Sequence, residues 1–385
     1  MTEDLALVLK DVQAYLSRYV VFTTAHQEIA TTLWVATTWA IAAFDVAPYL
    51  LITAPERQSG KTRLLEVLEA VVHKPLLAAG ISPAALYRVV ERQSPTLLLD
   101  EIDAIYGPKA AGNEELRALI NSGHRRGVKT YRMGGGGMTR LESFDSFCLK
   151  ALAGIESGRH LPETVVDRSI PIRLRRRAPT EEVVRYRRRV AAAEGAILAA
   201  KLNYLLGGIT ELEWPEMPAG ISDRATDVWE PLIAIADLAG EEWSEMGRAA
   251  AFEIAANPDP TYDSLGVRLL SDIRTVMGGT DRMSSTDLAR ALAELDEAPW
   301  GDLYGRAISV RKLADLLRPF GITSRNVRVG GAQAKGYTIA DFIESWKRYL
   351  PGVADVDLPP YEVSLFDGAD EPPEEEFTEP EASPW

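Results

Sequence analysis

The chain has 385 residues, 46% of them hydrophobic and 25% charged, so it is long enough to bury a sizeable core. Its net charge of −14 argues against a protein that coats nucleic acid with its whole surface. Eleven acidic residues follow Arg348, beyond which there is no lysine or arginine, so the rest of the chain is nearly neutral and leaves room for a local basic channel.

The number of cysteines and the charge of the N-terminus indicate in which cellular compartment the protein is expected. Cys148 is the only cysteine, which excludes a disulfide framework and a cysteine zinc cluster and favours a reducing, cytoplasmic setting. The first residues are acidic where a signal peptide would be basic. The most apolar region, Leu33 to Thr53, is interrupted by Asp45 and Pro48, so we expect no membrane span.

The N-terminal region predicts two helices. Apolar residues recur at helical spacing over 4–20, and a second helix rich in alanine and tryptophan is predicted over 28–44. We expect residues 1–45 to pack on the domain that follows.

A phosphate-binding loop is predicted directly after these helices. The apolar run Tyr49–Ile52 leads into a short polar loop, and Gly60-Lys61-Thr62 opens a predicted helix over 63–72. Backbone N–H groups at such a helix start surround phosphates, while Lys61 would reach the β- and γ-phosphates of ATP and Thr62 a Mg²⁺ ion. Pro55 stands where the full motif has its first glycine. The predicted nucleotide-binding residues are Pro55, Glu56, Arg57, Gln58, Ser59, Gly60, Lys61, Thr62 and Arg63.

A second motif is the acidic pair Asp100-Glu101, which begins 39 positions after Lys61. The apolar run Thr96–Leu99 ends in Asp100-Glu101, as a buried parallel strand with a charged carboxyl end would. Asp100 would hold the Mg²⁺ shell and Glu101 would orient or deprotonate the attacking water. The alternative is a solvated acidic turn after a core strand.

The order of these elements predicts the fold class. A further strand at Pro75–Gly80 lies between the two motifs, and a helix capped by Ser82 with Pro83 at its first position follows. We expect an α/β, three-layer P-loop NTPase core of the additional-strand, AAA+-like class. The predicted regions are N-terminal helices (1–45), the ATPase core (46–178), a helical lid (179–280), a small winged-helix-like domain (281–350) and a disordered acidic tail (351–385).

A basic hairpin is predicted between a helix over 114–121 and a core strand over 147–155. Two short strand-like runs flank the four glycines Gly134 to Gly137. In a ring this hairpin would face the pore and grip phosphates, although it could equally be a solvated loop. Its predicted nucleic-acid contacts are His124, Arg125, Arg126, Lys129, Arg132 and Arg140.

Two further arginines are candidate nucleotide contacts. Arg168 precedes a predicted strand and is the candidate to reach the γ-phosphate of a neighbouring subunit, with a salt bridge to Asp167 or Glu163 as the alternative. Arg224 follows the predicted cap Ser222 in the lid, whose helices are predicted over 180–206 and 222–255. It would either contact the bound nucleotide or cap its own helix.

Residues 283–350 predict two helices, a small hairpin and a closing helix, an arrangement that resembles a winged helix. Such domains bind DNA or dock proteins. The residues predicted to contact phosphates are Arg311, Lys312, Arg325, Arg328 and Lys335.

The tail from Pro351 is rich in proline and glutamate and is predicted to be disordered. Ser364-Leu365-Phe366 resembles the peptide by which bacterial replication proteins bind the sliding clamp, with Glu362 in place of the usual glutamine. The end at Trp385 also resembles the acidic tails of single-strand-binding proteins.

The run from Trp34 to Tyr349 as a whole resembles a family of phage and actinobacterial ATPase domains often found at the C-terminal end of primase–helicase polypeptides. The residues that carry this resemblance are Leu33–Ala36, Pro55-Glu56, Gly60–Thr62, Leu99–Asp103, Asn121–Gly127, Ala151–Ile155, Asp167–Ile170, Asp223–Ala225 and Lys335–Tyr337. The resemblance implies an AAA+-like core and a role in DNA replication.

The function expected from the sequence is therefore a Mg²⁺–ATP-driven motor, a helicase or translocase, that acts as a homo-oligomeric ring on single-stranded DNA. The alternative is a non-motor, ATP-switched loader or replication initiator that binds a helicase or clamp through its C-terminal region. A small-molecule kinase is disfavoured, because residues 283–350 have the pattern of a recognition module.

Overall fold

The computed structural model describes residues 2–78, 81–106, 114–134, 140–155, 161–256, 265–296, 298–303 and 305–350. The chain divides into two compact units, Met1–Arg268 and Leu269–Trp385. The predicted tail (351–385) and its Ser364–Phe366 peptide lie outside the described residues. None of the described helices combines the length and apolarity needed to cross a bilayer.

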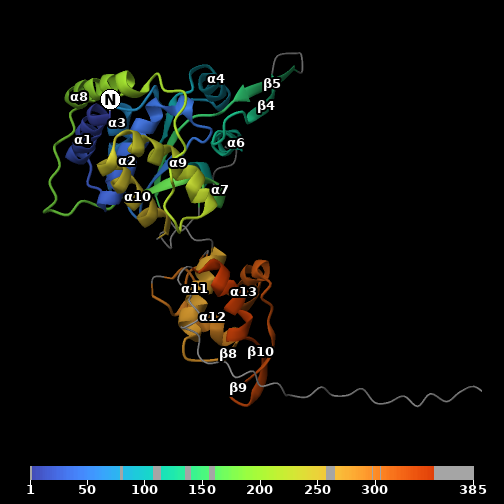
Figure 1. Cartoon of the computed structure of the whole chain (residues 1–385). Coiled ribbons are helices and arrows are strands. Elements are labelled where there is room, and N and C mark those ends of the chain that lie inside the picture. Colours follow the sequence, from blue (N-terminus) through green and yellow to red (C-terminus); the bar gives the residue numbers. More distant parts are fainter. Residues whose placement is uncertain are drawn as a thin grey trace, which may run out of the picture. The chain divides into compact units, whose positions relative to one another are not determined.

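The first unit is built on a parallel five-stranded sheet (Figure 1). Its strands, in spatial order, are β2 (Pro75–Leu77), β3 (Thr96–Leu99), β6 (Lys150–Ile155), β1 (Tyr49–Ala54) and β7 (Ser169–Arg173). Strand β6 lies between β1 and β3 and pairs Leu152 with Leu51 on one side and Leu99 on the other. Because all pairings are parallel, β1 and β3 end at the same edge.

Helices cover both faces of the sheet, because neighbouring strand residues point to opposite faces and both sets are apolar. Leu50 and Ile52 belong to one buried cluster and Tyr49 and Leu51 to another. The first cluster includes residues of α1 (Thr2–Tyr19), α2 (Ala25–Trp39), α3 (Lys61–Glu69), α8 (Arg188–Leu206), α9 (Asp223–Leu238) and α10 (Glu241–Ala256). The second includes residues of α4 (Pro83–Gln93), α5 (Ile102–Tyr106), α6 (Glu114–Ser122) and α7 (Glu163–Val166).

The helices of the predicted lid share this core. Helix α2 is buried along most of its length and packs against α9 and α10, and α8 packs against α1. Helices α1 and α2 thus share buried surface with α8, α9 and α10, and the structure does not separate the predicted lid from the predicted core at 178/179. The predicted helix over 180–206 begins only at Arg188.

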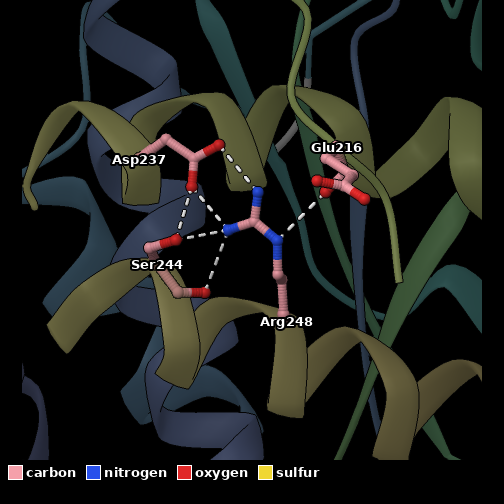
Figure 2. A network of polar contacts seen from close by, with 4 residues as sticks. All are labelled: Glu216, Asp237, Ser244 and Arg248. Carbon is pink, nitrogen blue, oxygen red and sulfur yellow. Dashed lines mark hydrogen bonds and ion pairs between the residues drawn. The ribbon is translucent and has the colours of Figure 1, made fainter. Parts of the chain in front are cut away.

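An arginine clamp joins α9, α10 and the segment that precedes α9 (Figure 2). The Arg248 guanidinium donates to Asp237 Oδ2 at 2.9 Å and to the backbone oxygen of Glu216 at 3.0 Å, and it also bonds Ser244. Burial alone would raise the pKa of Asp237, but the hydrogen bonds from Arg248 and Ser244 outweigh burial and lower that pKa.

The predicted hairpin forms outside the main sheet from β4 (Lys129–Gly134) and β5 (Arg140–Asp145) (Figure 1). On one face Phe144 packs against the ring of Tyr87 in α4, and Arg132 donates to the Tyr87 hydroxyl at 2.9 Å. The other face carries Lys129 and Tyr131. The residues between the strands, 135–139, lie outside the described part.

The second unit has its own core and a three-stranded antiparallel sheet of order β8-β10-β9. Its elements are α11 (Leu265–Met277), β8 (Arg282–Ser284), α12 (Ser285–Ala293), α13 (Val310–Leu317), β9 (Arg325–Val329), β10 (Ala332–Thr338) and α14 (Ile343–Tyr349). The sequence placed the domain boundary at 280/281, whereas the structure divides the chain before Leu269. From Leu269 onward, helix α11 belongs to the second unit, because Trp346 Nε1 donates to the Leu270 carbonyl at 2.9 Å and the apolar residues of this part of the helix are buried there.

Three short 3₁₀ helices connect longer elements in the described part of the chain. The 3₁₀ helices are η1 (Ile41–Ala43), η2 (Arg318–Phe320) and η3 (Ile339–Asp341). The predicted caps are confirmed for Ser82 and Ser222, whose side chains accept backbone N–H groups at the starts of α4 and α9.

Candidate functional site

The loop between β1 and α3, where the sequence predicts phosphate binding, makes a tight turn. Gly60 has φ +90° and Gln58 has φ +62°, so the chain turns sharply before α3 begins at Lys61. Ser59 Oγ and Lys61 Nζ both donate to the Glu56 carbonyl, at 2.8 and 3.0 Å. The Lys61 side chain therefore folds back over the loop and, at 8% exposure, is largely withdrawn from solvent.

The two sequence motifs meet at the carboxyl edge of the sheet. Thr62 Oγ1 donates to Asp100 Oδ2 at 2.7 Å, and Asp100 Oδ1 accepts the backbone N–H of Glu101 at 2.9 Å. Glu101 is exposed and has φ +55°, a conformation that non-glycine residues seldom adopt and that is common where a site constrains the chain. The Thr62 hydroxyl and the Asp100 carboxylate thus meet beside the start of α3, and the exposed Glu101 follows directly in the chain.

This set of oxygen donors fits Mg²⁺, which prefers oxygen ligands and takes several of them from phosphates and water. Among the described residues there is no group of three or more His, Cys, Asp or Glu side chains able to hold a metal by itself. A site that holds its metal together with phosphates needs no such group.

Arg168 lies at the opposite, amino edge of the sheet. It directly precedes β7, its carbonyl accepts the N–H of Tyr49 at 2.9 Å, and its guanidinium donates to the Asn121 carbonyl. The six residues of β1 span about 20 Å. Arg168 is therefore separated from the Lys61 loop of its own chain by the length of the strand.

Arg224 is not brought to the Lys61 loop, contrary to its predicted nucleotide contact in the same chain. Helix α9 starts beside the amino end of β7, where the Arg224 guanidinium pairs with Asp167. It lies with Arg168 in one cavity of about 480 Å³. The residues lining this cavity are Asn121, Ser122, His124, Arg125, Val128, Glu163, Thr164, Asp167, Arg168, Arg224 and Asp227.

The basic residues predicted as one nucleic-acid surface are divided by the structure. His124 is buried, its Nδ1 is 3.1 Å from the Ala47 carbonyl, and burial together with nearby arginines lowers its pKa to about 4. Arg126 donates to the carbonyls of Phe44 and Ile41. His124 and Arg126 thus make contacts within the folded chain. Arg132 does the same, because its guanidinium donates to the Tyr87 hydroxyl and lies over the Tyr87 ring.

The other three residues predicted to contact nucleic acid in this region are Arg125, Lys129 and Arg140. Arg125 is exposed and pairs with Asp227 at 2.8 Å, so it faces the cavity and not the hairpin. Lys129 is exposed on the outer hairpin face. Arg140 begins β5, and its side chain lies outside the described part.

The five basic residues of the second unit that were predicted to contact phosphates do not lie on one surface. The register of β9 and β10 puts Arg328 and Lys335 on one face of their hairpin, and both are exposed. Arg325 lies on the other face and pairs with Asp341 at 2.9 Å, so it fastens the hairpin to η3. Arg311, exposed, and Lys312, half-buried, lie in the first turn of α13.

Two residues with clear positions in these sites are not among the site residues predicted from the sequence. Asn121 holds Arg168 through its carbonyl and accepts a hydrogen bond from Thr164. Lys150 is fully buried at the start of β6, where its Nζ donates to the Cys148 carbonyl at 3.1 Å and lies 4.6 Å from the centre of the Tyr49 ring. A lone lysine in an apolar strand was the only signal, and Lys150 lies at the amino edge, away from the Lys61 loop.

Comparison with known proteins gives a family. A family model described as "Protein of unknown function (DUF3631)" matches residues 173–349. The "uncharacterized 28.9 kDa protein in xis 5′region" of Saccharopolyspora erythraea is 42% identical over 181 residues, which are 46% of this chain and 69% of that protein.

Solved structures give a distant likeness of fold alone. Two apo structures of the NrS-1 C-terminal region match at 12% identity and a TM-score of 0.43, over 86% of this chain and 75% of each of theirs. The sequence relative is the stronger finding. With its DUF3631 region at 173–349, the chain belongs to the same family as the Saccharopolyspora erythraea protein.

Proposed function

We propose that the protein is a P-loop ATPase of the additional-strand, AAA+-like class that works as an oligomeric motor on DNA in replication, as a helicase or translocase. The observation that carries the proposal is the 2.7 Å hydrogen bond between Thr62 and Asp100 beside the turn at Gly60. It joins the two motifs on which ATP hydrolysis depends in this class.

The order of the strands supports the class. Strand β6 separates β1, which leads into the Lys61 loop, from β3, which ends at Asp100. An added strand at that place distinguishes the proposed class from the kinase and GTPase group, in which the two strands are neighbours. The glutamate that follows Asp100 agrees with it, because hydrolysis by this class needs a base for water.

Each residue of the site has a proposed role. Lys61 and the first N–H groups of α3 bind the β- and γ-phosphates, and Glu101 orients and deprotonates the attacking water. Thr62 and Asp100 would hold Mg²⁺, which when bound neutralises charge on the phosphates. Arg168 contacts the γ-phosphate of an adjacent subunit, where a guanidinium stabilises the charge of the transition state.

Two surfaces supply the proposed DNA contacts. The outer face of the β4–β5 hairpin offers Lys129 beside the exposed ring of Tyr131, a cation next to a stacking surface. In the second unit, the order α11, β8, α12, α13, β9, β10 is that of a winged helix. Its exposed hairpin face presents Arg328 and Lys335 to phosphates.

ATP hydrolysis measured with and without single-stranded DNA tests the proposal. We expect hydrolysis by the wild type that DNA stimulates, and loss of turnover in Lys61→Ala and Glu101→Gln. Hydrolysis by a strict monomer that DNA leaves unchanged would refute the motor.

A second function, a non-motor loader or initiator switched by ATP, is favoured by the compact second unit, since winged helices also dock proteins. A strand-displacement assay with and without the replicative helicase separates the two functions. A motor displaces the strand alone, whereas a loader acts only when the helicase is present.

A further inference from the structure

We infer that the cavity at the amino edge of the sheet receives the terminal phosphate of a nucleotide bound to a second copy of the chain, and that Arg125 and Arg224 bind this phosphate together with Arg168. The inference rests on the proposed ATPase function. Arg224, predicted from the sequence to contact the nucleotide of its own chain, would instead contact the nucleotide of a neighbouring copy. Arg125, predicted to contact DNA, would instead contact a phosphate of ATP.

The cavity gathers three guanidinium groups from three separate segments. Arg125 follows α6, Arg168 precedes β7, and Arg224 lies in the first turn of α9, and all three line the same space of about 480 Å³. Since a water molecule occupies about 30 Å³ in the liquid, this space has room for a phosphate group with its hydration. Convergent arginines are the usual protein solution for binding phosphate oxygens.

The three guanidinium groups can leave their present partners for a phosphate at little cost in free energy. Arg125 pairs with Asp227 and Arg224 with Asp167, and the side-chain exposures, 65% and 45% in the first pair and 77% and 37% in the second, are those of weak surface ion pairs. Arg168 donates to a neutral backbone carbonyl. A multiply charged phosphate can therefore displace the two carboxylates and take all three cations.

His124 lines the same cavity and responds to the positive charges gathered there. Its imidazole lines the cavity, and burial lowers its pKa, with further lowering by the charges of Arg168, Lys150 and Arg125. The imidazole stays neutral at physiological pH, so it adds no charge that changes with pH.

The geometry selects a second copy as the source of the phosphate. The Lys61 loop follows the carboxyl end of β1, while the cavity opens at the amino ends of β1 and β7, about 20 Å away along the strands. A nucleotide on the chain's own loop therefore cannot reach the cavity. Contact of one copy's carboxyl edge with the next copy's amino edge is a head-to-tail interface, which closes into a ring when the rotation permits.

The cavity also connects to the hairpin. Asn121, which holds Arg168, begins the segment that passes Arg125 and Val128 before it enters β4 at Lys129. Thr130 Oγ1 further donates to Ser122 Oγ at 2.9 Å. A phosphate that draws on Arg125 and Arg168 therefore acts on the segment that supports the hairpin in its middle, at Arg125, and at its start, through the contact of Arg168 with Asn121.

Mixed oligomers test the inference. Arg224→Ala keeps its own Lys61 loop but lacks the cavity arginine, and Lys61→Ala keeps the cavity but lacks a working loop. The two variants are co-expressed with different tags, purified through both tags, and assayed for ATP hydrolysis. Each alone should be inactive, whereas the mixture should recover up to about one quarter of the wild-type rate, the share of interfaces that pair an intact loop with an intact cavity. The same recovery is expected for Arg125→Ala and Arg168→Ala.

The outcomes are separable. An inactive wild type refutes the proposed ATPase function itself. An active wild type with no recovery in the Arg224→Ala or Arg125→Ala mixtures, or full activity of either variant alone, overturns the inference and leaves the ATPase function standing. Arg18→Ala, which removes another solvent-exposed arginine–carboxylate pair, with Glu194, is the matched control and should keep wild-type activity. Sedimentation checks assembly, and Arg224→Lys or Arg125→Lys replaces a variant that fails to assemble.

Discussion

Thr62 and Asp100 are 38 positions apart in the chain, yet their side chains form a hydrogen bond at 2.7 Å. The sheet explains this contact, because one strand separates β1 from β3 and both end at the same edge. The sequence predicted that these residues would meet, since each motif follows an apolar run whose carboxyl end must lie at the ligand edge of a parallel sheet. The backbone conformations of Gln58 and Glu101 could not be foreseen, because neither residue type favours positive φ.

The role of Asp100 predicts a specific loss. Asp100→Asn keeps the shape of the side chain but removes the charge that would hold Mg²⁺, so kcat for ATP hydrolysis should fall about 100-fold or more. The rate should be measured across a range of Mg²⁺ concentrations, with a higher Mg²⁺ requirement expected for the variant. Asp103→Asn is the control in the same turn, because the hydrogen bond that the Ile155 N–H donates to the Asp103 carboxylate at 3.2 Å can be accepted by an amide oxygen as well. Equal losses in both variants would contradict a metal-holding role for Asp100.

At the scale of the element, the sequence predicted the β4–β5 hairpin but not which face of it each basic residue occupies. The basic residues around its glycine turn suggested one phosphate-binding surface. Strand register instead places Arg132 on the face that packs on α4 and Lys129 on the outer face. The partner of Arg132 is Tyr87, 45 positions earlier in the chain, and no local pattern connects the two.

This division predicts two different phenotypes. Lys129→Ala should weaken binding of single-stranded DNA and lower the slope of log affinity against log salt by about 1, with no change in the unfolding midpoint. Arg132→Ala should mainly lower the free energy of unfolding, because it frees the hairpin from Tyr87. Salt-dependent fluorescence anisotropy and urea unfolding measure the two effects. Identical behaviour of both variants in both measurements would refute the division.

The arginine clamp predicts a pH-dependent stability. Because the pKa of Asp237 is lowered in the folded protein, its contribution is complete above the ordinary value of 3.8 and is lost as pH falls through the lower folded value. Asp237→Asn should therefore cost about 1–3 kcal/mol of unfolding free energy at neutral pH. The difference from wild type, followed by urea unfolding, should stay constant down to mildly acidic pH and shrink only below it. A difference that already disappears between neutral pH and pH 5 would contradict the assignment.

At the scale of the whole molecule, the division into two units follows from packing that composition does not show. Helix α11 lies before the predicted boundary, but Leu270 and its apolar neighbours are buried in the second unit. The sequence predicts the lid (179–280) as a region distinct from the ATPase core, yet the buried length of α2 requires α9 and α10 to cover it. Periodicity predicts that a helix has an apolar face, but not which other apolar face covers it.

The second unit predicts a DNA contact that is independent of ATP. Replacing both Arg328 and Lys335 by alanine should lower affinity for DNA and its salt dependence, and leave ATP hydrolysis measured without DNA unchanged. Arg325→Ala is the contrasting variant, because Arg325 pairs with Asp341 and its loss should act on the stability of the unit. Unchanged DNA affinity in the double variant would favour protein docking as the role of this unit.

Equilibrium binding of a fluorescent ATP analogue in the presence of Mg²⁺ tests the central claim most directly, because it examines the Lys61 loop without requiring turnover, assembly or DNA. The wild type and Glu101→Gln should bind with similar affinity, since Glu101 acts on water and not on the nucleotide. Lys61→Ala should bind about 10- to 100-fold more weakly, the cost of losing one charge-assisted phosphate contact. Binding of Lys61→Ala that equals that of the wild type would contradict the account.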